Sequence, residues 1–116
     1  MLRTIHIVCA YLIIALGVAH LLFTFHDYDE FVLDALWFAS AGFAIIFAGF
    51  LNLIATRMAG RDKFVRVLCF LSNVVVAALF AATLWLMQQP QVFVGILLFA
   101  VAAVVTLASP ARAADV

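Results

Sequence analysis

Charged residues are scarce in this sequence. Only 10% of its 116 residues are Asp, Glu, Lys or Arg, whereas 70% are apolar, and the mean hydropathy is +1.31. A soluble domain is about half apolar and about a quarter charged, because its surface faces water. The lack of charge therefore excludes an ordinary soluble domain, and it predicts that a lipid bilayer surrounds most of the side chains.

Cysteines and catalytic motifs are also nearly absent. The two cysteines, Cys9 and Cys69, are too few and too far apart for a disulfide framework or a CxxC motif. No glycine-rich phosphate loop, nucleophile elbow or HExxH pattern occurs. We therefore predict no catalytic residue, no metal site, no resident cofactor and no nucleic-acid partner, and we expect a protein that is not an enzyme.

Four apolar runs make up almost the whole chain, and each is close to the roughly 20 residues that a membrane-spanning helix needs. They predict helices over residues 4–25, 34–56, 64–87 and 91–108. The first run is as long as the membrane is thick, so we interpret it as a retained helix and not as a cleaved signal peptide. The predicted fold is all-α, a single membrane domain over residues 1–116 that forms an up-down-up-down bundle of four transmembrane helices.

The basic residues predict the orientation. They lie at the N-terminus, in or beside the second connection, and in the C-terminal tail, as Arg3, Arg57, Arg61, Lys63, Arg66 and Arg112. In a four-helix up-down bundle these places share one side of the membrane, and the positive-inside rule makes that side cytoplasmic. Trp37 and Trp85 are expected about one turn inside the opposite helix ends, as part of an aromatic belt. These signals predict a multi-pass inner-membrane protein with both termini in the cytoplasm.

Residues 19–38 hold two of the three histidines and four of the six acidic residues, but no Lys or Arg. Counting about 1.5 Å per residue places His20 at the depth of Ser40 and Thr83. Ionisable residues at membrane depth are costly and often functional. We therefore predict a ligand-binding or proton-handling site that opens outward, with His20, Asp34, Trp37, Ser40 and Thr83. The alternative is that His20 only forms a hydrogen bond between helices.

Other polar residues are given simpler roles. Asn52 and Asn73 lie at similar depths on the cytoplasmic side of their helix midpoints, which predicts a structural hydrogen bond between the second and third helices. His6 lies at the inner interface, where a histidine costs little, and we assign it no function. An outer cluster of one histidine and four carboxylates has ligand types suited to a divalent cation but lacks a diagnostic spacing. Its members are His26, Asp27, Asp29, Glu30 and Asp34. An acidic loop that sets the topology is the other interpretation.

Three classes of function are compatible with this pattern. The first is a structural or accessory subunit that forms a homodimer or joins a larger membrane complex. The second is a bundle that binds haem, quinone or lipid near His20. Haem with two histidine ligands would need His20 from two chains, because the three histidines lie at different depths. The third is a small proton-coupled transporter in which His20 carries the proton.

Two resemblances accompany these hypotheses. The layout is similar to that of the small multidrug resistance exporters, although no Glu lies in residues 1–25, where those proteins carry an embedded glutamate. The segment LDALWFASAGFAIIFAGFLNLIAT, with HLLF before it, resembles a group of small uncharacterised bacterial four-helix membrane proteins. The second resemblance covers the first two helices. It implies a four-helix inner-membrane protein and does not imply any biochemical activity.

Overall fold

The computed structural model describes residues 1–58 and 61–109. It contains four helices, α1 (Leu2–Asp27), α2 (Leu33–Met58), α3 (Lys63–Thr83) and α4 (Pro90–Ala108), and no strand within those two ranges. All four helices are long and apolar enough to cross a membrane. The prediction of an all-α protein with four membrane-spanning helices is therefore confirmed. Arg112, to which we assigned a topological role, lies outside the described residues.

The end of α3 differs from the prediction. The helix stops at Thr83, whereas the apolar pattern predicted helix up to residue 87. Four backbone hydrogen bonds of turns follow, from Leu84 N–H to Ala81 C=O at 3.1 Å to Met87 N–H to Thr83 C=O at 2.8 Å. Gln89 is extended (φ −104°, ψ 152°), because the ring of Pro90 disfavours the helical conformation in the residue before it. Trp85 therefore lies beyond the helix and is 91% exposed, so its expected place inside the helix end was wrong.

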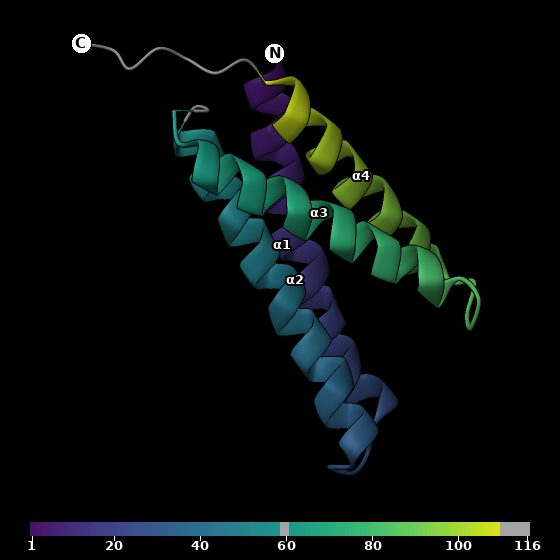
Figure 1. Cartoon of the computed structure of the whole chain (residues 1–116). Helices are drawn as coiled ribbons and strands as arrows, with labels where there is room; N and C mark the ends of the chain where they lie inside the picture. Colours follow the sequence, from purple (N-terminus) through teal and green to yellow (C-terminus); the bar gives the residue numbers. More distant parts are fainter. Residues whose placement is uncertain (59–60, 110–116) are drawn as a thin grey trace.

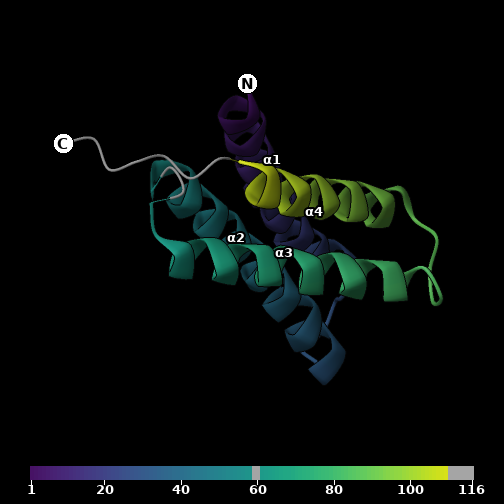
Figure 2. The same cartoon turned by 45° about the horizontal axis from the view of Figure 1, so that its top comes forward.

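The helices form two antiparallel hairpins, α1–α2 and α3–α4, which cross each other (Figures 1 and 2). The α1–α2 hairpin is closely packed because glycines face the partner backbone. A Cβ added to Gly17 would lie 2.9 Å from the carbonyl oxygen of Gly42, and one added to Gly49 would lie 3.2 Å from that of Ala10. Small residues at such positions let the backbones of membrane helices approach each other closely.

The starts of α1 and α3 and the ends of α2 and α4 gather at one end of the molecule, which we call the basic end. Arg3 on α1 donates from Nε to the carbonyl of Thr56, near the end of α2 (3.3 Å). In the other hairpin, Arg66 on α3 donates to the carbonyls of Thr106 (3.1 Å) and Leu107, near the end of α4. These carbonyls have no partner within their own helix, and the arginine charge complements the helix dipole.

The two hairpins pack against each other near the basic end and diverge toward their tips, residues 28–32 and 84–89 (Figures 1 and 2). The core between them contains residues of all four helices, and its last members toward the tips are Leu16 on α1 and Phe80 on α3. Between α2 and α3 the divergence leaves an open, mostly apolar groove of about 550 Å³. The groove is lined by Ala44, Phe47, Ala48, Leu51, Leu71, Ser72, Val75 and Val76.

The arginine contacts give a prediction for stability. Arg66→Gln should lower the free energy of unfolding by about 1–3 kcal/mol, because hydrogen bonds from a charged donor to free helix-end carbonyls are lost. Thermal unfolding of the purified protein in detergent measures the change. Lys63→Gln removes the same charge from an exposed position at the start of the same helix and should change stability by less than about 0.5 kcal/mol. Equal losses in the two variants would contradict this role of Arg66.

Candidate functional site

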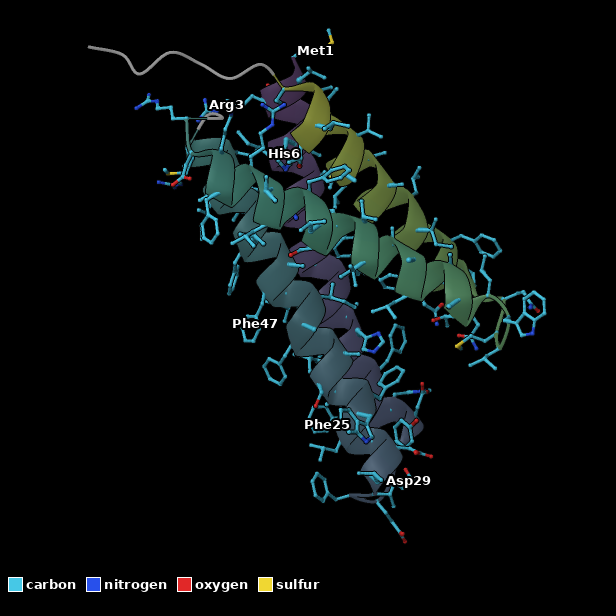
Figure 3. All side chains as sticks on the ribbon, in the orientation of Figure 1. Met1, Arg3, His6, Phe25, Asp29 and Phe47 are labelled. Carbon is cyan, nitrogen blue, oxygen red and sulfur yellow. The ribbon has the colours of Figure 1, made fainter. Side chains whose placement is uncertain are left out.

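Five buried polar side chains join all four helices near the basic end, and we call them the polar network. His6 comes from α1, Asn52 from α2, Cys69 and Asn73 from α3, and Thr106 from α4. None is more than 4% exposed. Figure 3 shows His6 close to the start of the chain, where the two hairpins meet. Buried polar groups at membrane depth need partners, and these five side chains supply them to one another.

The amide of Asn52 is the centre of the network. Its Oδ1 accepts hydrogen bonds from Asn73 Nδ2 (2.9 Å) and Cys69 Sγ (3.3 Å), and it lies 2.8 Å from His6 Nε2. Its Nδ2 donates to Asn73 Oδ1 and to the carbonyl of Ala48, both at 2.8 Å. The two asparagines, which the sequence placed in one layer, therefore exchange two hydrogen bonds across the hairpins.

The same contacts determine the protonation of His6. Because Asn52 Nδ2 must donate to the Ala48 carbonyl, Oδ1 is the atom that faces the imidazole. A carbonyl oxygen can only accept, so Nε2 of His6 carries the hydrogen. The network thus assigns the tautomer of a histidine that is almost completely buried.

Thr106 connects α4 to the network. Its hydroxyl donates to the carbonyl of Ala102 (2.6 Å). Its oxygen also lies 3.4 Å from His6 Nε2 and 3.7 Å from Cys69 Sγ. The imidazole, the thiol and both amides are therefore engaged inside the chain, and the arrangement suits helix association better than chemistry on a substrate.

The residues of the predicted outer site are placed differently. His20 is half-buried and stacks on Phe38, with ring centroids 3.9 Å apart and an interplanar angle of 17°. Its Nε2 atom is buried and, among the described residues, has no hydrogen-bond partner. Ser40 and Thr83 donate to carbonyls of their own helices, those of Leu36 (2.7 Å) and Leu79 (2.8 Å).

The other two members of that site are exposed. Asp34 lies in the first turn of α2, and Trp37 is 66% exposed. No hydrogen bond or ring contact that the structure shows joins either of them to His20. The structure thus stacks His20 on Phe38, which the sequence did not single out, and it shows no hydrogen bond between His20 and the other four residues of the predicted site.

The last turn of α1, just before the acidic outer connection, carries an ion pair. His26 Nδ1 lies 3.0 Å from Asp27 Oδ1, and both side chains are exposed. Within residues 1–58 and 61–109, no three His, Cys, Asp or Glu side chains come close enough together to hold a metal ion. An acidic loop that sets the topology is therefore the simpler interpretation of this segment.

His6 is the residue that sequence reasoning missed. Its position close to the N-terminus suggested an interfacial location, where a histidine needs no partner. The signal that reveals it is depth relative to the helix ends. Cys69 lies near the start of α3, Asn52 and Thr106 lie near the ends of α2 and α4, and His6 lies near the start of α1. Polar residues at one level in four helices indicate a shared layer.

No protein-family model matches the sequence, and no curated protein and no solved structure is found to be similar to it.

The hydrogen bonds of Asn52 predict a large effect of its replacement. Asn52→Leu should lower the free energy of unfolding by about 2–4 kcal/mol, since it leaves His6 and Asn73 without their main partners in a buried site. Thermal unfolding in detergent measures the loss. The matched control is Ser72→Ala, next to Asn73 on the groove, which should cost less than about 0.5 kcal/mol. An Asn52→Leu protein as stable as the control would refute the central role of this amide.

The tautomer of His6 is a separate prediction. In protein labelled with ¹⁵N-histidine, the Nε2 resonance of neutral His6 should show coupling to a directly bonded proton. The same resonance should shift in the Asn52→Leu variant, because the hydrogen-bond acceptor is lost. Solid-state NMR in lipid detects both effects. A neutral His6 protonated only at Nδ1 would contradict the assigned direction of the hydrogen bond.

Proposed function

We propose that this protein is a structural or accessory subunit of the bacterial inner membrane, which acts as a homo-oligomer or within a larger membrane complex. The observation that carries the proposal is the closed polar network. Intramembrane histidine, cysteine and asparagine side chains are the groups expected to mark a reaction or transport site. Here these side chains bind one another across four helices, as polar side chains do when they hold membrane helices together.

The charge distribution supports the proposed placement in the membrane. Arg3, Arg57, Lys63 and Arg66 all lie at the basic end, whereas residues 28–32 and 84–89 at the hairpin tips contain no Lys or Arg. The positive-inside rule then favours a cytoplasmic basic end, and with it cytoplasmic termini.

The oligomeric state tests the proposal. Two copies of the full chain that carry different affinity tags are expressed together, extracted in a mild detergent, and captured through one tag. We expect the second tag to be recovered, and we expect native mass spectrometry to show a defined oligomer or a complex of fixed stoichiometry. Mixing the two tagged proteins only after extraction controls for aggregation. A strictly monomeric protein in the detergent extract, and also after cross-linking in the intact membrane, would refute the proposal.

A second candidate function is the binding of a hydrophobic ligand, and the unpaired Nε2 atom of His20 favours it. One imidazole beside the aromatic ring of Phe38 suits a quinone or a lipid with a hydrogen-bonding head. Haem with two histidine ligands does not fit one chain, because His6 is engaged in the polar network and His26 pairs with Asp27 in the exposed last turn of α1.

The ligand is tested on the protein as purified from its membrane. A Soret band in the visible spectrum would show haem, and solvent extraction followed by chromatography would show quinone. We expect any bound quinone to fall at least tenfold in His20→Ala, while Ser40→Ala, whose hydroxyl bonds its own helix, retains it. Absence of both haem and quinone from the parent protein would remove those two ligands from the second candidate.

A further inference from the structure

The helix α3 is covered least by the rest of the chain. Only 11% of its apolar 18-residue window is buried, against 28% in α1 and α2 and 39% in α4. Of its 21 residues only Cys69 and Asn73 are buried, and both belong to the polar network. The rest of the helix surface is therefore left to lipid or to another protein.

One line of side chains on this uncovered surface has a regular spacing, and we call it the α3 seam. Its members follow one another at alternating steps of four and three residues, as Leu68, Ser72, Val75, Leu79 and Ala82. Ser72 is half-buried and the other four are exposed. This heptad spacing is the one that faces a partner helix in a left-handed pair of helices.

The α3 seam borders the groove between α2 and α3, because Ser72 and Val75 belong to both. The α2 wall of the groove includes Ala44 and Ala48, two small residues one turn apart. Small residues let the backbone of a second helix approach closely in a membrane. A helix that packs on the seam therefore also enters the groove.

The hydroxyl of Ser72 has no hydrogen-bond partner that the structure shows within residues 1–58 and 61–109. Other hydroxyls at membrane depth donate to carbonyls of their own helices, as in Ser40, Thr56, Thr83 and Thr106. Ser72 is the tenth of the 21 residues of α3, so it lies near the middle of a bilayer that this helix spans. At that depth neither water nor a lipid headgroup is present to accept its hydrogen bond.

The first hairpin shows what the corresponding position contacts. Arg3 and Arg66 make the same contact in the two hairpins, each from Nε to a threonine carbonyl near the end of the next helix. Six residues after Arg3 lies Cys9, and six residues after Arg66 lies Ser72. Cys9 Sγ donates to the carbonyl of Leu98 on the adjacent α4 (3.0 Å). This position of the hairpin thus faces another helix, and Ser72 lacks such a partner within its own chain.

We propose that the α3 seam is a homodimer interface, in which a second copy of this chain places its α3 in the groove between α2 and α3. A twofold axis along the membrane normal brings the same residue of both copies together. The Ser72 hydroxyls of the two copies then meet at the axis, and one donates to the other. A lipid chain in the groove offers no acceptor at this depth, whereas a second copy does. The interface rests on the proposed homo-oligomer and assigns it a surface.

Cysteine cross-linking of the full chain in native membranes tests the interface. Val75→Cys lies on the seam, and its matched control is Val74→Cys, which replaces the same residue type at an exposed position about 100° around the helix. After mild oxidation we expect at least fivefold more disulfide-linked dimer from Val75→Cys than from Val74→Cys. The parent chain, with buried Cys9 and Cys69, gives the background.

Equal or reversed yields in protein that is still recovered as an oligomer would overturn this interface and leave the proposed function standing. A groove filled by lipid gives background yield at both positions, which would also overturn it. Failure of the two differently tagged copies to be captured together, in the membrane and in detergent, would remove the interface and the homo-oligomer at once.

A second measurement uses a variant that introduces no cysteine. Ser72→Ala should raise the dissociation constant of the dimer in lipid vesicles about three- to tenfold, the loss typical of one hydrogen bond between membrane helices. Energy transfer between labelled copies, measured over a range of protein-to-lipid ratios, gives the constant. Ser40→Ala, whose hydroxyl bonds its own helix, should leave it unchanged. Equal constants for the two folded variants would contradict the pairing of Ser72 across the axis.

Discussion

The hydrogen bonds of one buried amide determine how the helices of this protein meet. Inside a bilayer no water is available, so the donors and the acceptor of Asn52 have to find partners within the protein. Those partners come from α1, from α3 and from the preceding turn of α2, and they reach α4 through His6 and Thr106. The crossing of the two hairpins is therefore fixed near the basic end, and the arrangement of their tips follows from it.

The four helices and the pairing level of Asn52 with Asn73 could be anticipated from the sequence, because bilayer thickness sets helix length and depth can be counted along each helix. The divergence of the hairpins could not be anticipated from the sequence, because counting depth assumes that the helices stay side by side. That assumption put Thr83 beside His20. Proximity to the N-terminus alone predicts an interfacial His6 without a role, whereas a partner on α4 lies at the same level.

Intramembrane polar residues are commonly taken as markers of function, and this protein shows why each one has to be judged by its partners. The polar network and His20 have similar chemistry but opposite hydrogen-bonding states. In the network the side-chain groups contact one another across four helices, so their hydrogen bonds stabilise the bundle. The buried Nε2 nitrogen of His20 has no hydrogen-bond partner in the described part of the chain.

The spacing of the network partners along the chain also bears on how the protein is made. His6 and Thr106 are 100 residues apart, so the layer is complete only after the last helix has left the ribosome. Each hairpin nevertheless contains a pair of its own, His6 with Asn52 in the first and Cys69 with Thr106 in the second. Each hairpin thus pairs part of its polar surface within itself, and the Asn52–Asn73 exchange joins the two hairpins.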